Sequence, residues 1–170
     1  NGEEDDRVCL VMGLRRTGKT TMIRQAILEM VSEDRQVAYI KATAADTMPV
    51  LSSDLRQLYQ NGYRHVFIDE VTLMDDFIDS AALLSDIHAA QGMRLVLTGT
   101  DSLAFFLALR QELYDRAVII HTTFIPFREH SRVLGIHSMN DYLRYGGTMR
   151  AGERVEGQVR IDSRHASFRD

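Results

Sequence analysis

Eight residues near the start of the chain constrain its fold more than any other feature. Residues 13–20 read GLRRTGKT and match the pattern G-x-x-x-x-G-K-[ST] without a mismatch. An apolar run, RVCLVMG, occupies residues 7–13, and residues 19–31 carry apolar side chains at helical spacing. The sequence therefore predicts a buried strand, a glycine-containing loop and a helix in direct succession.

The same alternation of apolar runs and helical patterns continues along the chain. Further strands are predicted over residues 36–42, 65–70, 94–100 and 117–123. Further helices are predicted over residues 50–60, 75–90, 102–113 and 126–135. Strands that alternate with helices favour an α/β fold, in which helices cover both faces of a parallel sheet. The near-continuous apolar runs are typical of strands buried on both faces.

Charge and cysteine content exclude several classes of protein. The net charge of -4 provides no overall attraction to nucleic acid or to an anionic membrane. The single cysteine, Cys9, lies in an apolar run, where it fits a small buried side chain, and one cysteine forms no disulfide framework. No apolar run approaches the length of about 18 residues that spans a membrane. These features predict a cytoplasmic protein with no membrane partner.

The loop at residues 13–20 has the composition of a phosphate cradle. Gly13 and Gly18 let successive backbone N–H groups converge on phosphate oxygens at a helix N-terminus. Lys19 can reach the β- and γ-phosphates, and the Thr20 hydroxyl can bind Mg²⁺. The two arginines of the loop lie outside the minimal motif, and they either line its outer face or are solvated. The expected nucleotide-binding residues are Gly13, Arg15, Arg16, Thr17, Gly18, Lys19, Thr20 and Thr21.

Two carboxylates follow the predicted strand at residues 65–70. Ligands bind at the carboxyl edge of a parallel sheet, which is where Asp69 and Glu70 would lie. Asp69 suits the Mg²⁺ of a phosphate-loop enzyme, and Glu70 can polarise a water for attack on the γ-phosphate. The alternative is an exposed loop start. Beside a complete phosphate loop, the catalytic interpretation is favoured.

Hydroxyl side chains end the next predicted strand. Thr98 or Thr100 can lie between the attacking water and the γ-phosphate, and the sequence does not choose between them, since Thr98 also fits a structural role. Acidic residues at 75, 76 and 79 are interpreted as favourable charges at a helix start rather than as a metal cluster. The six histidines show no metal-ligand spacing and receive no role.

Taken together, these motifs resemble a known family. The chain resembles the prokaryotic AAA-type (AAA+ superfamily) ATPases, relatives of the archaeal ATPase and STAND groups, whose P-loop domain commonly precedes a helical and winged-helix or endonuclease-like C-terminal region. The segments that carry the resemblance are GLRRTGKTTMI (13–23), HVFIDEV (65–71), LVLTGTDSL (95–103), LYDRAVIIH (113–121), FIPFREHSRVLG (124–135) and DYLRYGG (141–147).

The resemblance implies a three-layer α/β/α sandwich with strand order 5-1-4-3-2. Lys19 and Thr20 would belong to the Walker A motif, and Asp69 and Glu70 to the Walker B motif. We expect the P-loop ATPase domain over residues 1–145 and an irregular, poorly ordered tail over residues 146–170, so that the family's C-terminal lid would be truncated. The chain also begins without methionine, and we expect that an upstream segment is missing.

The resemblance further makes Thr98 or Thr100 the sensor of the γ-phosphate. Arg116 matches the arginine of the family's Gly-Arg pair before the fifth strand, although Asp115 replaces the glycine. Arg116 is therefore either a γ-phosphate-sensing or trans-acting arginine, or a surface residue. The expected catalytic residues are Glu70, Lys19, Thr98 and Arg116; the expected metal ligands are Thr20 and Asp69; the expected cofactors are ATP and Mg²⁺.

Two functions remain open at this point. The first is Mg²⁺-dependent hydrolysis of ATP to ADP, which the intact Glu70 favours. The second is a nucleotide-gated switch with slow or no hydrolysis, acting through a protein partner, another copy of the chain, or DNA contacted by missing regions. A GTPase would carry an Asn-Lys-x-Asp guanine reader, which the sequence lacks, and a small-molecule kinase fits the paired carboxylates less well.

Overall fold

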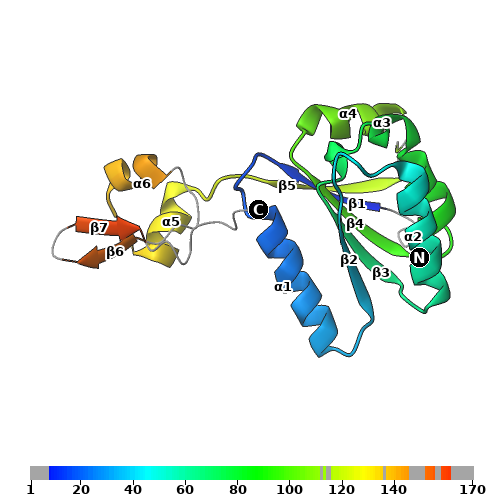
Figure 1. Cartoon of the computed structure of the whole chain (residues 1–170). Helices are drawn as coiled ribbons and strands as arrows, with labels where there is room; N and C mark the ends of the chain where they lie inside the picture. Colours follow the sequence, from blue (N-terminus) through cyan, green and yellow to red (C-terminus); the bar gives the residue numbers. More distant parts are fainter. Residues whose placement is uncertain are drawn as a thin grey trace. The chain divides into compact units, whose positions relative to one another are not determined.

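The computed structural model describes residues 8–111, 113, 116–135, 137–145, 152–155 and 158–161 (Figure 1). The chain divides into two units. The first comprises Asn1–Leu14 and Lys19–Thr122, and the second comprises Arg15–Gly18 and Thr123–Asp170. The predicted boundary between a domain at residues 1–145 and a tail therefore stays a prediction.

The first unit is built on a five-stranded parallel sheet. Its strands are β1 (Val8–Gly13), β2 (Val37–Lys41), β3 (His65–Asp69), β4 (Arg94–Gly99) and β5 (Ala117–Thr122). They lie in the order β2-β3-β4-β1-β5, and every neighbouring pair is parallel (Figure 1). This confirms the predicted α/β/α sandwich and its strand order, because reading the sheet from its other edge gives 5-1-4-3-2.

Helical segments connect the strands of the first unit. They are α1 (Lys19–Ser32), α2 (Met48–Gln60), the 3-10 turn η1 (Val71–Leu73), α3 (Phe77–Ser80), the π-helical turn η2 (Leu84–Ala89) and α4 (Ser102–Gln111). The predictions of helices after the first, second and fourth strands are thereby confirmed. Among the described residues, no helix is both long and apolar enough to cross a membrane.

The helix predicted over residues 75–90 is confirmed in its position, but it is not a regular α-helix. The segment forms the α-helical turn α3, continues through Ala81 and Leu83 with right-handed helical backbone, and becomes π-helical in η2, where the N–H of Ala90 donates to the carbonyl of Ser85. Tertiary contacts account for the difference. The Ser52 hydroxyl lies 2.9 Å from His88 Nε2, and the Met48 N–H donates to Asp76 Oδ2 at 2.8 Å. Both contacts tie the segment to α2, and local periodicity carries no information about them.

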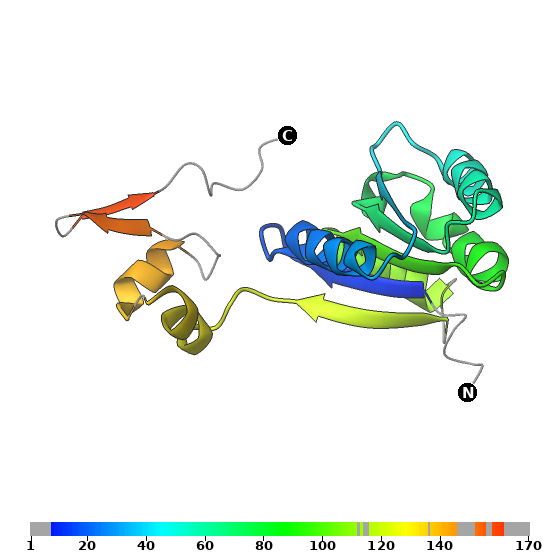
Figure 2. The ribbon, with the colours of Figure 1, turned by 90° about the horizontal axis from the view of Figure 1, so that it is seen from below.

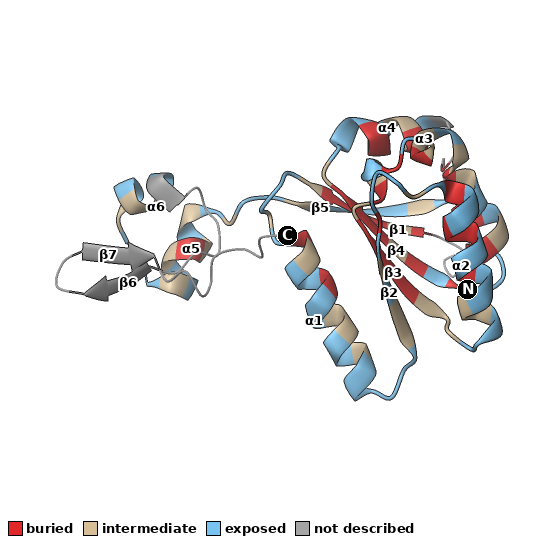
Figure 3. Ribbon diagram, viewed as in Figure 1, coloured by how far each residue is buried: buried red, intermediate tan, exposed pale blue. Residues whose placement is uncertain are grey.

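The two faces of the sheet differ in character. On one face, Ile68, Leu97 and Leu10 form a cross-strand row in an apolar core that α2, α3, η2 and α4 complete. Since side chains alternate along a strand, their sequence neighbours point to the other face, where α1 lies. Figure 2 shows α1 alongside the sheet, and Figure 3 shows that most of α1 is exposed, whereas the central strands β1, β3 and β4 are largely buried. The sparsely covered α1 face is the face that carries polar side chains.

A buried histidine in the core gives the first prediction. His88 is 0% exposed, and its burial, together with the nearby positive charge of Arg56, lowers its pKa below the ordinary value of 6.5. The unfolded chain therefore binds a proton more readily than the folded chain. The free energy of unfolding is expected to fall as pH decreases below about 6.5, and His88 contributes its full stabilisation above that value.

Urea unfolding at a series of pH values from about 7.5 to about 5.5 measures this effect. In His88→Gln the slope of stability against pH should decrease, because the amide can still reach Ser52 but does not titrate. His121→Gln, at an exposed position of β5, is the matched control and should retain the slope. An unchanged slope in His88→Gln would assign the pH dependence to other groups.

The second unit contains α5 (Phe127–Leu134), α6 (Met139–Tyr145) and an antiparallel pair, β6 (Gly152–Val155) with β7 (Gln158–Ile161). The Tyr142 ring lies edge-on to Phe127 and His130, and its hydroxyl donates to the Ile125 carbonyl at 2.8 Å. The paired strands differ from the irregular tail expected over residues 146–170. Residues 146–151, 156–157 and 162–170 lie outside the described part of the chain.

Candidate functional site

The loop of the G-x-x-x-x-G-K-T motif begins where β1 ends at Gly13 and finishes where α1 begins at Lys19. A Cβ atom at Gly13 would lie 2.2 Å from Thr122 Oγ1 and 2.3 Å from the Thr122 carbonyl oxygen, so this position requires glycine. Gly18 and Arg16 both have left-handed backbone, with φ of 86° and 66°. The loop thus has the alternating backbone geometry that directs successive N–H groups to one side.

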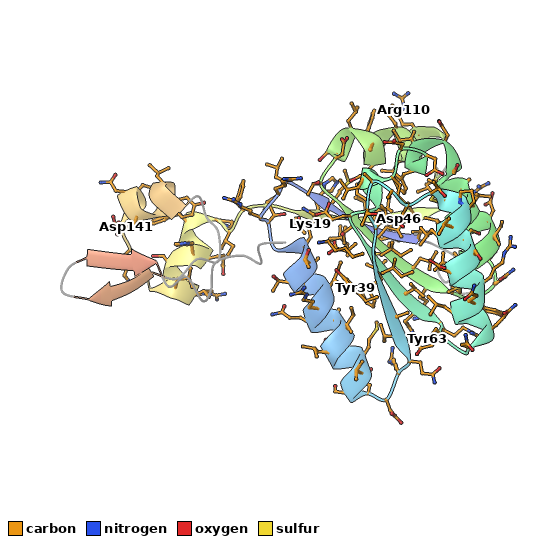
Figure 4. All side chains as sticks on the ribbon, viewed as in Figure 1. Lys19, Tyr39, Asp46, Tyr63, Arg110 and Asp141 are labelled. Carbon is orange, nitrogen blue, oxygen red and sulfur yellow. The ribbon has the colours of Figure 1, made fainter. Side chains whose placement is uncertain are left out.

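Lys19 is held against the loop that precedes it. Its side chain is 5% exposed, and Nζ donates to the carbonyl oxygens of Gly13 and Leu14, both at 2.8 Å. Figure 4 shows Lys19 at the beginning of α1. An anion that replaces these neutral carbonyls would form charge-assisted hydrogen bonds with the ammonium group, and such bonds are stronger than those to neutral acceptors. This position therefore suits a phosphate group.

The carboxylate of Asp69 is the centre of the polar cluster on the α1 face. Asp69 is 2% exposed at the end of β3. Its Oδ2 accepts hydrogen bonds from Thr20 Oγ1 at 2.9 Å and from the Tyr39 hydroxyl at 3.0 Å, and its Oδ1 accepts one from Thr98 Oγ1. The structure thus joins the phosphate-loop threonine to the predicted metal-binding aspartate, across 49 residues of sequence.

Tyr39 is a site residue that the motifs did not reveal. Burial of its hydroxyl, and next the charge of Asp69 and the hydrogen bond to it, raise the pKa of Tyr39 to about 12. The hydroxyl consequently stays protonated and remains a donor to Asp69 at neutral pH. The sequence signal for Tyr39 was weak, since it is a polar-tipped residue between the apolar Ala38 and Ile40. Sheet register, rather than sequence spacing, places it beside Asp69.

Glu70 has a strained backbone. Its φ is 60°, a left-handed value that a residue with a Cβ atom adopts at a cost of about 1–3 kcal/mol. The Glu70 N–H donates to Thr98 Oγ1 at 3.2 Å, and Thr100 Oγ1 donates to Glu70 Oε2 at 3.3 Å. Residues of this kind occur frequently at active sites, and the two threonines hold both ends of Glu70.

The two threonines left open by the sequence have different surroundings. Thr98 is 0% exposed and bonds Asp69 and the Glu70 backbone, whereas the half-buried Thr100 bonds the Glu70 carboxylate. We predict that Thr98→Val lowers the free energy of unfolding by about 1–3 kcal/mol, because it removes one partner each from two polar groups. Thr100→Val should leave stability nearly unchanged and alter turnover. Urea unfolding and phosphate-release assays on both variants provide the comparison. Equal stability losses would contradict this division of roles.

Arg116 lies far from this cluster. It precedes the first residue of β5, and its carbonyl accepts a hydrogen bond from Val8 N at the start of β1. Gly13 is five residues further along β1, which corresponds to about 16 Å. Arg116 Nη1 bonds Asp86 Oδ1 at 2.7 Å in a half-exposed ion pair. The structure therefore places Arg116 at the amino ends of the strands, opposite to the end that carries the loop.

The other predicted site residues lie along the loop and at the start of α1. Arg15, Arg16 and Thr21 are exposed, and Thr17 is half-buried. Within the described residues, the histidine, cysteine and acidic side chains form no group of three that could hold a metal ion. The acidic residues at positions 75, 76 and 79 belong to no such group. The carboxylate of Asp76 accepts a hydrogen bond from the N–H of Met48, the first residue of α2.

Oxygen ligands that suit Mg²⁺ are nevertheless present. Thr20 and Asp69 already share a hydrogen bond, and Mg²⁺ prefers one or two protein oxygens together with water and phosphate oxygens. The hydroxyl of Thr20 and the carboxylate of Asp69 therefore fit the role of holding Mg²⁺ beside a bound phosphate. This fit explains why the described residues need no larger group of metal ligands.

Comparison with known proteins identifies the family. A model of the AAA domain family matches residues 5–131, which are 127 of the 170 residues. No curated protein matches the chain. Among solved structures, the RuvB Holliday junction branch migration motor of Thermotoga maritima aligns with a TM-score of 0.47 and 18% sequence identity. That alignment covers 75% of this chain and 41% of the RuvB chain.

The family match includes the loop, the polar cluster and all five strands of the sheet. The matched segment ends within α5, so the family is shown for the first unit and not for the C-terminal residues. The resemblance noted in the motifs is thereby confirmed. This chain belongs to the AAA domain family and contains an ATP-binding module of the AAA-type P-loop ATPases.

Proposed function

We propose that this chain binds Mg²⁺-ATP at the loop of residues 13–20 and hydrolyses it to ADP and phosphate. The observation that carries the proposal is the hydrogen bond between Thr20 and Asp69. It joins the helix that follows the phosphate loop to the strand that bears the paired carboxylates. The phosphates and the residue that activates water are thereby brought to the same edge of the sheet.

Each residue of the cluster has a role in this proposal. The loop N–H groups and Lys19 bind the phosphates, and Lys19 exchanges its bonds to the loop carbonyls for bonds to phosphate oxygens. Thr20 and Asp69 hold Mg²⁺, which neutralises charge on the phosphates when it is bound. Glu70 accepts a proton from the attacking water, and Thr100 orients the Glu70 carboxylate.

Arg116 has a different role in the proposal. Its position at the opposite end of the sheet supports action on the nucleotide of a neighbouring copy of the chain. The half-exposed ion pair with Asp86 does not prevent this, because such a surface pair contributes only about 0–1 kcal/mol. The proposal therefore includes a homo-oligomer in which one copy completes the site of the next.

A slow switch is the second candidate, because Arg116 lies at the opposite end of the sheet from the loop, so that a single copy of the chain does not bring it to its own nucleotide. Phosphate release from ATP by this chain, measured with Mg²⁺ and with EDTA, separates the candidates. Steady Mg²⁺-dependent release supports the ATPase. Bound ATP without release, over a range of protein concentrations, supports the switch. A failure to bind ATP overturns both.

A further inference from the structure

The hydroxyl of Tyr39 is one of three that hold the Asp69 carboxylate, and it comes from the strand at the edge of the sheet. Tyr39 on β2 pairs with Phe67 on β3, and Asp69 follows Phe67 by two residues. Since side chains two residues apart share a face, Tyr39 and Asp69 are diagonal neighbours, at a spacing that an aromatic side chain can cross. Figure 4 shows Tyr39 on β2 and Lys19 at the beginning of α1.

The Tyr39 hydroxyl bonds the same carboxylate oxygen as Thr20. Thr20 Oγ1 lies 2.9 Å from Asp69 Oδ2, and the Tyr39 hydroxyl lies 3.0 Å from it. A threonine hydroxyl has one proton, and when that proton is donated to Asp69 the oxygen lone pairs point elsewhere. Those lone pairs are then available to a cation. The orientation of Thr20 as a metal ligand thus depends on where Oδ2 is fixed.

Two of the three bonds come from outside the phosphate-loop helix and hold the carboxylate independently of Thr20. Thr98 fixes Oδ1, and Tyr39 is the donor from outside the phosphate-loop helix that fixes Oδ2. Without the Tyr39 hydroxyl, Oδ2 keeps only its bond to Thr20. The carboxylate and the Thr20 hydroxyl can then shift together, and the orientation of Thr20 is less well fixed. Residues that hold a metal ligand by a hydrogen bond typically change metal affinity by about 10–100-fold when they are removed.

We infer that Tyr39 is a positioning residue for Mg²⁺ in this site and acts through Asp69. The inference rests on the proposed function, because it assumes that Thr20 and Asp69 hold the metal beside bound nucleotide. It extends that function to a residue outside the phosphate loop and the paired carboxylates. A purely structural hydroxyl would instead stabilise the buried carboxylate without affecting the Mg²⁺ dependence of nucleotide binding.

Tyr39→Phe tests the inference, since it keeps the ring and removes only the hydroxyl. Binding of a fluorescent ATP analogue is measured while Mg²⁺ is titrated. The Mg²⁺ concentration at half-saturation should rise about tenfold, whereas nucleotide affinity at saturating Mg²⁺ should stay within about twofold. Tyr142→Phe, which removes a phenolic hydrogen bond to the Ile125 carbonyl in the second unit, is the matched control and should leave the Mg²⁺ midpoint unchanged.

A double substitution, Tyr39→Phe combined with Asp69→Asn, gives a second test. In Asp69→Asn, adding Tyr39→Phe should not shift the Mg²⁺ midpoint further, because Tyr39 acts through the carboxylate that is already absent. If the unaltered chain binds nucleotide in a Mg²⁺-dependent way and Tyr39→Phe has the same Mg²⁺ midpoint, this inference is overturned and the proposed function stands. An additive shift in the double variant would also overturn it. A lack of Mg²⁺-dependent nucleotide binding in the unaltered chain would overturn the proposed function as well.

Discussion

Glu70→Gln is expected to leave ATP bound and to slow its hydrolysis by roughly a hundredfold or more, the usual contribution of a general base. Glutamine keeps the size of the side chain and can still accept the Thr100 hydrogen bond, so the strained backbone and its contact with Thr98 should persist. It does not accept a proton from water. The proposed nucleotide site at Lys19 and the loop is not altered by this substitution.

The measurement is phosphate release at matched nucleotide occupancy, with the binding affinity determined separately. Glu33→Gln provides the matched control, because Glu33 is an exposed glutamate paired with Arg35, and its neutralisation should not alter turnover. Equal turnover in Glu70→Gln and the unaltered chain would mean that another group activates the water. Lost ATP binding in Glu70→Gln would show that the residue supports the site rather than the chemistry.

Lys19→Ala is expected to abolish nucleotide binding or to weaken it at least about tenfold, because a charge-assisted hydrogen bond to phosphate contributes roughly 1.5–3 kcal/mol. The loss has two parts. The ammonium group that meets the phosphates is removed, and the carbonyls of Gly13 and Leu14 lose the donor that links them. The loop is then less ordered before the nucleotide arrives.

Lys41→Ala serves as the control for charge, since Lys41 is the other lysine in the chain and is exposed at the end of β2. Isothermal titration of Mg²⁺-ATP into the two variants gives the comparison. An unchanged affinity in Lys19→Ala would exclude the loop as the phosphate site. A similar loss in both variants would indicate a general charge effect, which added salt would screen.

Local sequence patterns predicted the elements whose formation depends on residues close together in the chain. The apolar runs of β1, β3 and β4 and the helical spacing of α1 and α2 reflect burial that repeats with the period of the element itself. The segment at residues 75–90 has the same helical spacing and is helical, but it becomes π-helical in η2, where Ser52 from another element binds the His88 side chain. Periodicity describes one element at a time and omits such contacts.

The candidate site shows the same division. The sequence determined the phosphate loop and the paired carboxylates, because the chemistry of each requires particular residues at fixed spacing within one strand and its loop. Tertiary structure decided the rest. Sheet register brought Tyr39 to Asp69, gave Thr98 and Thr100 different hydrogen-bond partners, and placed Arg116 at the end of the sheet opposite to Gly13. The physical reason is that the pairing of strands decides which residues of a parallel sheet lie side by side. The spacing of those residues along the chain does not specify this pairing.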